Sequence, residues 1–275
     1  MKIGVKVARN DYKQMLELNP EALEFSLEER DLKGEWIDDL DLNFFFFDLI
    51  VHVPIFFENG ILIDIASENP KLRKQSLILV LKTFEIARAL YETGYFKGAP
   101  IIILHPGGIT RQVIDFPNFL KKCLLESMGE ILSKIDSTFF ICTLENMPQF
   151  YWYRGEQYNA NLFKAREEII EVLRQLQIYL CLDLCHAKLY CNYINADFYD
   201  YIASLAPYTK HIHASDAVGV SGEGLQIGEG EIDFKRTLSL FKHRELAIVP
   251  EIKNKDRKMS FKIAVERLRA IKAIT

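Results

Sequence analysis

Short apolar runs recur along the chain at wide intervals, and longer segments of mixed polarity separate them. Most of the runs are rich in Ile, Val, Leu and Phe and lack strict alternation of apolar and polar positions. They cover residues 2–7, 22–27, 49–56, 100–108, 139–148, 178–186, 211–217 and 246–252. Continuous apolar runs of this kind are typical of parallel strands that are buried on both faces. The pattern therefore predicts eight strands of one parallel sheet.

Segments with the apolar spacing of helices lie between many of these runs. The segment 69–94 is the longest, and Gly94 is a natural end for its helix. Similar patterns predict helices at 116–135, 161–176, 234–242 and 260–273. Strand–helix alternation repeated eight times predicts an α/β fold, namely a (β/α)8 TIM barrel that forms a single domain over residues 1–275; a doubly wound open sheet is the alternative. The segment 28–45 is polar and irregular, so the pattern does not locate its helix.

Composition and charge narrow the class of protein. The chain has 275 residues, of which 49% are hydrophobic and 26% charged, as in ordinary soluble domains. A net charge of -4 and a pI of about 5.9 argue against nucleic acid as the partner. The N-terminal residues do not resemble a signal peptide, and polar residues interrupt the greasiest stretch, 42–57. We therefore expect a cytoplasmic protein with no membrane segment.

The chain has five cysteines, an odd number, with no CxxC pair: Cys123, Cys142, Cys181, Cys185 and Cys191. We expect reduced thiols in the core of a cytoplasmic protein. Zinc binding through Cys181 and Cys185 is the alternative, although no second pair completes such a site.

Residues of metal-ligand type stand where the predicted strands end, which is where TIM barrels build active sites. They are His52, His105, Glu145, Asp183 with His186 just after it, His211, His213 with Asp216 nearby, and Glu251. Taken singly, a core histidine or a helix N-cap would explain several of them. Taken together, three carboxylates buried near one another are costly without a cation. We therefore predict a metal site made by Glu145, Asp183, Glu251 and His213, where His213 is preferred to His211 because it lies nearer the strand end.

These motifs resemble the xylose-isomerase-like barrel superfamily, which includes sugar and sugar-phosphate isomerases and epimerases and also endonuclease IV. The resemblance is strongest in "LHPGG", "LEN", "LDLCH", "HIHASDA", "IGEGEIDF" and "PEI". It implies one divalent cation held by Glu145, Asp183, His213 and Glu251, with the two glutamates as acid and base and His186 on the substrate. The chain departs from ketose epimerases at Gly219, where those enzymes place an arginine.

Endonuclease IV provides the alternative within the same superfamily. Its first zinc would match His52, His105 and Glu145, and its second the four residues named above. Its third zinc needs an Asp-x-His that "GVSGEGLQIGEGEIDF" does not contain, and Ile55 replaces its DNA-distorting tyrosine. Together with the acidic balance, these departures argue against repair of abasic DNA. The segment 215–234 also looks like barrel proteins associated with sialic-acid-type (nonulosonic acid) sugar pathways.

We expect from this constellation a metal-dependent sugar or sugar-phosphate isomerase or epimerase. A carboxylate-rich site suits Mn, Mg, Co or Zn, and the cation would stabilise an enediolate formed by proton transfer. The expected catalytic residues are Glu145, Glu251 and His186, and the expected substrate-binding residues are His186, His105, His52, Asp216 and Gln226. An endonuclease IV-like phosphodiesterase with a second metal on His52, His105 and Glu145, and a non-catalytic sugar-binding barrel, are the alternatives. The expected partner is a small carbohydrate; since barrels of this class often pair, a homodimer is a further expectation.

Overall fold

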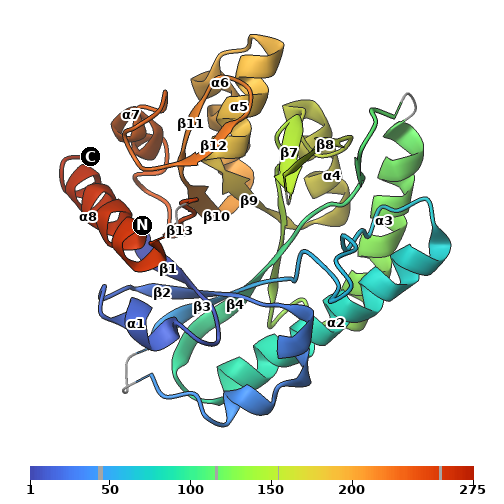
Figure 1. Cartoon of the computed structure of the whole chain (residues 1–275), viewed down its shortest axis with the longest axis horizontal. Helices are drawn as coiled ribbons and strands as arrows, with labels where there is room; N and C mark the ends of the chain where they lie inside the picture. The colour runs from blue at the N-terminus through green and yellow to red at the C-terminus, as the bar shows by residue number, and fades with distance from the viewer. Residues whose placement is uncertain (43–45, 115–116, 154, 254–255) are drawn as a thin grey trace.

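Eight parallel strands close into a barrel in the computed structural model, which describes residues 1–42, 46–114, 117–153, 155–253 and 256–275 (Figure 1). Neighbouring strands follow the order β1-β13-β10-β9-β6-β4-β3-β2, and β1 pairs with both β2 and β13, which closes the ring. The strands are β1 (Lys2–Val7), β2 (Ala22–Ser26), β3 (Phe47–His52), β4 (Phe96–Leu104), β6 (Ile141–Glu145), β9 (Tyr179–Asp183), β10 (Thr209–Ala214) and β13 (Ala247–Pro250). The predicted single-domain TIM barrel is confirmed, and the open sheet is wrong.

Helices surround the barrel. Along the chain they are α1 (Tyr12–Leu16), α2 (Pro70–Glu92), α3 (Pro117–Lys134), α4 (Arg166–Leu176), α5 (Leu184–Ile194), α6 (Phe198–Leu205), α7 (Phe234–Ser239) and α8 (Arg257–Ala273). The five predicted helices are present with shifted ends. For example, α2 begins at Pro70 because the Asn69 side chain accepts hydrogen bonds from the first backbone N–H groups of the helix. Helix α8 packs beside β1, so the two ends of the chain meet on one side of the barrel (Figure 1).

Two short 3-10 helices replace the helix that could not be located in 28–45. They are η1 (Glu29–Lys33) and η2 (Glu35–Ile37); residues 43–45 of that segment lie outside the described residues. A capping box between Glu28 and Asp31 starts η1, and Gly34 ends it in a left-handed conformation with φ 78°. Local capping thus keeps this segment short and irregular.

Extra strands outside the barrel were not predicted. One three-stranded sheet consists of β5 (Ile109–Thr110), β7 (Phe150–Tyr153) and β8 (Glu156–Ala160), and a separate hairpin consists of β11 (Asp216–Val218) and β12 (Gly222–Leu225). The predicted strand 178–186 is too long, because Asp183 ends β9 and its side chain caps α5 by accepting a hydrogen bond from the His186 N–H. These insertions all follow barrel strands at their C-terminal ends.

The core between barrel and helices is apolar. All five cysteines are free and buried, as expected for reduced core thiols, and Cys181 belongs to a separate small cluster with Ala22, Ile50, Ile103 and Ala247. None of the described helices combines the length and the apolar character that crossing a bilayer requires.

Candidate metal centre and substrate pocket

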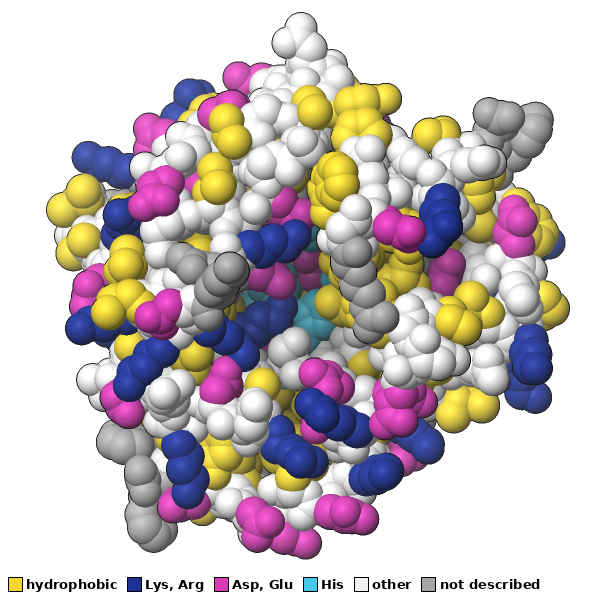
Figure 2. All heavy atoms as spheres, viewed as in Figure 1, with side chains coloured by type: hydrophobic (Ala, Val, Ile, Leu, Met, Phe, Trp, Pro, Cys, Tyr) yellow, Lys and Arg dark blue, Asp and Glu magenta, His cyan; other side chains and the backbone are white. Residues whose placement is uncertain are grey.

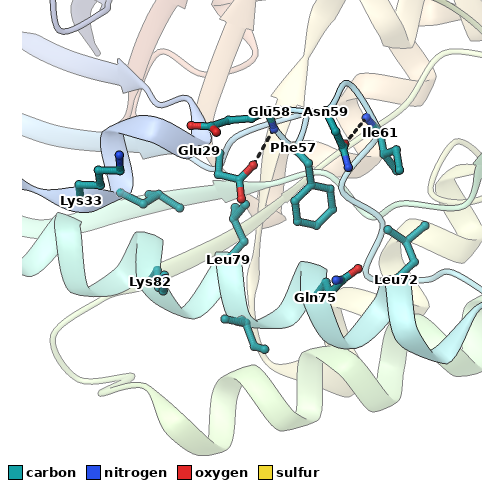
Figure 3. Close-up of a pocket in the computed structure, with 12 residues that line it drawn as sticks. Glu29, Lys33, Phe57, Glu58, Asn59, Ile61, Leu72, Gln75, Leu79 and Lys82 are labelled. Atoms are coloured by element: carbon teal, nitrogen blue, oxygen red, sulfur yellow. Dashed lines mark hydrogen bonds between the residues drawn. The ribbon is translucent and has the colours of Figure 1, made fainter.

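The barrel face seen in Figure 2 is hollowed at its centre, and histidine, acidic and lysine or arginine side chains gather there. A cavity of about 570 Å³ lies elsewhere, between η1, the loop after β3 and α2 (Figure 3). Phe57, Leu72 and Leu79 are among its lining residues, and no histidine lines it. Among the described residues, every cluster that could hold a metal ion lies in the barrel and none in this outer cavity.

The four residues predicted as metal ligands come together at the strand ends. Glu145 ends β6, Asp183 ends β9, His213 lies in β10, and Glu251 directly follows β13; one ligand atom of each lies within 4.8 Å of the others. The register of the sheet places His213 directly opposite Asp183. Three carboxylates and one imidazole in this space are the donor set that a divalent cation prefers.

His213 is oriented as a metal ligand would be. Its Nε2 lies 2.9 Å from Glu24 Oε2, and because a carboxylate only accepts, Nε2 carries the hydrogen. Its Nδ1 has no hydrogen-bond partner among the described groups and faces Glu145 Oε2 at 3.4 Å and Glu251 Oε2 at 3.1 Å. A neutral ring would point a lone pair at two carboxylates, so this geometry requires a positive charge between them. A bound cation fits, and the Glu24 contact is the carboxylate–histidine pair that commonly orients metal-bound imidazoles.

The pKa of His213 also indicates that a positive charge is favoured at this place. Burial alone would lower this pKa, but Cys181 and the carboxylates Glu24, Glu145 and Glu251 hold it well above its ordinary value. A proton on Nδ1 and a metal ion therefore compete for the same place.

A second ligand set shares Glu145. His52 Nδ1 lies 2.8 Å from the Val53 carbonyl and must donate to it, which leaves the Nε2 lone pair facing Glu145 Oε2 at 3.4 Å. His105 Nε2 lies 3.4 Å from the same oxygen. His52, His105 and Glu145 thus meet the requirement for a second cation, with Glu145 able to serve both.

His186 lies beside the ligands and is held by its neighbours. Its Nδ1 donates to the Asn146 carbonyl at 2.9 Å, and its backbone N–H donates to Asp183 Oδ1 at 2.7 Å. The Asn146 side chain in turn bonds both backbone groups of Asp183, at 2.8 and 3.0 Å. The three-residue spacing between Asp183 and His186 therefore lets one oxygen of Asp183 cap α5 through the His186 N–H. The other oxygen stays available to the cluster, and the position of His186 is fixed.

Two of the acidic residues in the cluster differ in pKa. Burial raises the pKa of Asp183 to about 6 although His186 opposes this. Burial would raise the pKa of Glu251 too, but Lys6 and His213 lower it to about 2, with Lys6 Nζ 2.8 Å from Glu251 Oε1. The expectation that Glu251 is buried is wrong, because its side chain is 37% exposed at the pocket mouth.

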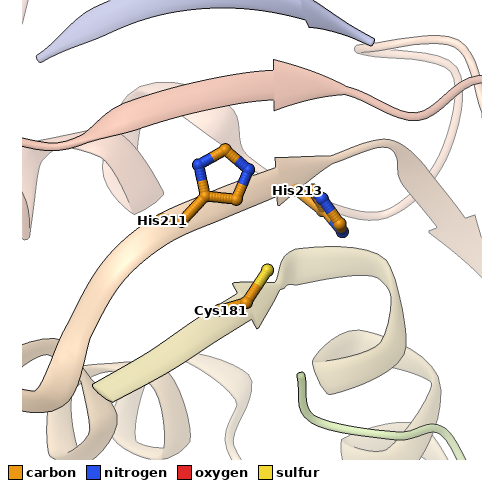
Figure 4. Close-up of side chains that lie close together, drawn as sticks. All are labelled: Cys181, His211 and His213. Atoms are coloured by element: carbon orange, nitrogen blue, oxygen red, sulfur yellow. The ribbon is translucent and has the colours of Figure 1, made fainter. Parts of the chain in front are cut away.

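The floor of the pocket lies beneath the ligands and consists of four residues: Glu24, Lys6, His211 and Cys181. Cys181, His211 and His213 could in principle hold a metal (Figure 4). However, both Nε2 atoms donate to Glu24 Oε2 at 2.9 Å, and Lys6 Nζ lies 3.3 Å from Glu24 Oε1. Because both Nε2 atoms already donate to Glu24, a metal in this cluster would have to use the Nδ1 atoms, and His211 Nδ1 has no hydrogen-bond partner among the described groups. We interpret the floor as the support of His213, which Glu24 orients through Nε2. Cys185 is not part of this cluster, contrary to the zinc alternative.

Two predicted substrate-binding residues have other tasks. Asp216 is fully buried and accepts backbone hydrogen bonds from Ala217, Gly228 and Ile232, so it organises the loop after β10. The Gln226 amide donates to the Ser260 carbonyl and accepts from the Ile227 N–H, which ties it to α8. Backbone groups thus use polar atoms of both side chains, and their contact with substrate stays a prediction.

Sequence reasoning missed Lys6, Glu24 and Glu223. The signal for the first two is a charged residue inside an apolar run. Tyr151 and Tyr153 share a hydrogen bond of 2.6 Å, and the Tyr151 ring lies 5.9 Å from that of His186. Tyr151 therefore borders the site beside His186, and Tyr153 contacts Tyr151.

Known proteins resemble the chain over most of its length. Protein MJ1311 of Methanocaldococcus jannaschii is 26% identical over 209 residues, which are 76% of this chain and 65% of that protein, so the chain spans less than two thirds of this relative. Probable endonuclease 4 of Aquifex aeolicus is 26% identical over 74% of this chain and 68% of its own length. The crystal structure of a D-tagatose 3-epimerase-like protein, 22% identical, superposes with a TM-score of 0.74 over 100% of this chain and 99% of that one, which supports the fold.

The family model described as xylose isomerase-like TIM barrel matches residues 11–273. This match covers nearly all of the chain and agrees with the closed barrel and its strand order. The chain therefore belongs to the xylose isomerase-like TIM barrel family.

Proposed function

We propose that the protein is a metal-dependent isomerase or epimerase of a sugar or sugar phosphate. The observation that carries the proposal is the convergence of Glu145 and Glu251 on one four-ligand cluster from different parts of the barrel wall. In the strand order, β9 and β10 separate β6 from β13. Two carboxylates that approach from separate sides could serve opposite faces of one substrate carbon.

The chemistry would be proton transfer beside a carbonyl. A divalent cation on Glu145, Asp183, His213 and Glu251 would polarise that carbonyl and stabilise the developing negative charge. One glutamate would remove the proton, and the other would return a proton to the opposite face or to the neighbouring carbon. His186, held by Asn146 and Asp183, would orient a substrate hydroxyl. A place in a nonulosonic acid pathway is supported only by the likeness of residues 215–234.

Hydrogen exchange tests the proposal directly. Metal-loaded protein is incubated in D2O with a panel of aldoses, ketoses and their phosphates, and NMR follows deuterium entering the carbon beside the carbonyl. We expect exchange with at least one sugar, and Glu145→Gln or Glu251→Gln to slow it by at least about 100-fold, the usual contribution of a general acid or base. Glu229→Gln, a change of an exposed glutamate on the loop after β12, is the control and should leave the rate unchanged.

Phosphodiester hydrolysis is the second candidate, because His52, His105 and Glu145 form a second ligand set that a one-metal isomerase does not need. The zinc-loaded protein would then cleave bis(p-nitrophenyl) phosphate, and His105→Ala would abolish cleavage. Cleavage of this ester without deuterium exchange on any sugar would replace the first proposal by the second. If the protein shows neither deuterium exchange nor ester cleavage, the non-catalytic sugar-binding barrel is the remaining alternative.

A further inference from the structure

The β11–β12 hairpin holds one carboxylate, Glu223, over the pocket in a fixed position. Asp216 anchors the start of the hairpin through its bonds to the loop backbone, and the Lys253 N–H donates to the Gly224 carbonyl at 2.9 Å. Gly224 has φ 75°, and a Cβ there would lie 2.7 Å from Lys253 Cγ, so a larger residue would not fit. The backbone on both sides of Glu223 is thus tied down.

The carboxylate of Glu223 is only partly satisfied. Its side chain is 12% exposed, and Oε1 pairs with Lys253 Nζ at 2.7 Å. Oε2 is buried and has no hydrogen-bond partner among the residues that the structure describes. A buried acceptor without a donor costs free energy, so this oxygen favours a ligand that brings a donor. Lys253 is half-exposed and can move aside to admit one.

Glu223 also faces the imidazole expected to touch substrate. His186 Nε2 lies 3.7 Å from Glu223 Oε1, which is too far for a direct hydrogen bond. The ring does not need Glu223 for its orientation, because Nδ1 already donates to Asn146. A substrate hydroxyl group between the two side chains could donate its hydrogen to Glu223. Contacts therefore run outward from Glu145 through His186 to Glu223.

We propose that Glu223 is a specificity-determining residue that accepts a hydrogen bond from a substrate hydroxyl remote from the metal ligands, while Lys253 donates to a neighbouring substrate oxygen. This inference rests on the proposed sugar isomerase or epimerase function. It defines the substrate class more narrowly, because the unpaired oxygen of Glu223 needs a hydrogen-bond donor, which an ionised phosphate or carboxylate group at this end does not bring. The preferred substrate therefore carries a neutral hydroxyl there.

Calorimetric titration of the metal-loaded protein tests this subsite with a panel of D-ketohexoses, their 6-deoxy analogues and their 6-phosphates. The wild type should bind at least one ketohexose about tenfold or more tightly than its 6-deoxy analogue and its 6-phosphate, the usual loss when a charged hydrogen bond is removed. Glu223→Met should reduce the difference from the deoxy analogue to within about threefold. Glu223→Gln, which keeps one acceptor oxygen, should fall between, and Glu229→Met should behave as the wild type.

The outcomes separate the two proposals. Sugar binding that prefers the 6-phosphate, or a hydroxyl preference that survives in Glu223→Met, overturns the subsite and leaves the isomerase proposal intact. Failure of the folded, metal-loaded wild type to bind any sugar in the panel overturns both. Circular dichroism of each variant shows whether it is folded.

Discussion

Glu24 and Glu145 are both buried carboxylates inside the barrel, and they contact opposite sides of the same His213 ring. Glu24, in the floor, receives N–H groups from two imidazoles and lies close to Lys6. Glu145, one level higher, has four imidazole nitrogens at 3.4 Å from its oxygens, and of these His52 Nε2 carries no hydrogen when its ring is neutral. The same residue types thus pair imidazole N–H groups with a carboxylate at one level, and at the next they direct an imidazole lone pair at a carboxylate, which favours a cation.

The difference shows that the role of a histidine here depends less on residue type than on which ring nitrogen carries the hydrogen. That choice decides whether the ring supports a neighbour or offers a lone pair to a metal ion. Where backbone carbonyls or Glu24 take the N–H of a ring, its other nitrogen becomes free for metal. Variants at the two levels should therefore behave differently.

The largest effect is expected from Asp183→Asn in the ligand cluster. Loss of a ligand should weaken metal binding by more than the roughly 100-fold that changes outside the ligand set can cause. The metal-free variant should nevertheless be more stable than the wild type at pH 7, by on the order of 2 kcal/mol, because the buried carboxylate with a pKa of about 6 is removed and Asn still caps α5.

The pH dependence of this effect has a definite sign. The folded pKa of Asp183 lies above its value in the unfolded chain, so between about pH 4 and 6 the folded state holds the extra proton and stability falls as pH rises. Urea denaturation of both proteins after chelation should show the advantage of the variant at pH 7 and none below about pH 4. An equal difference at both pH values would contradict the assignment.

A smaller effect on metal is expected from Glu24→Gln in the floor. Losing the carboxylate that orients His213 should weaken metal binding about 10- to 100-fold. It should also destabilise the metal-free protein by about 3 kcal/mol, because Lys6 and His211 lose a buried partner. Competition with a chelating dye and thermal denaturation measure the two effects. The partly exposed Glu21 just before β2 gives a matched control, Glu21→Gln, and equal behaviour of the two variants would refute the supporting role of Glu24.

The smallest effect is expected from Cys181→Ala. If the floor only supports His213, this variant should keep its full metal content by elemental mass spectrometry and lose about 1 kcal/mol of stability. Loss of one bound ion would make Cys181, His211 and His213 a metal site and remove the contrast between the two levels.

Much of the barrel and the ligand set could be predicted from the sequence because both follow from the chain order of strands. Parallel strands bring their C-terminal ends to one rim, so Glu145, Asp183, His213 and Glu251 had to be neighbours. Glu24 and Lys6 could not be assigned because a charge within an apolar run does not reveal its partner on another strand. Glu223 lies in a glycine-rich stretch without periodicity, and its distance to His186 depends on a hairpin whose turn has no apolar pattern. The backbone contacts of Asp216 and Gln226 could not be predicted either, because residue type alone does not show which backbone groups bond a side chain.

The His213 ring, held by Glu24 on one side and facing Glu145 and Glu251 on the other, makes metal loading an ion-exchange reaction. These neighbours raise the pKa of the ring well above its ordinary value, which favours a second proton on Nδ1 while no cation is bound. A cation that entered the four-residue cluster would have to displace such a proton, so its uptake would release acid and would be favoured at higher pH. In a barrel that binds its cation there, metal content would depend on the pH of the medium without any conformational change.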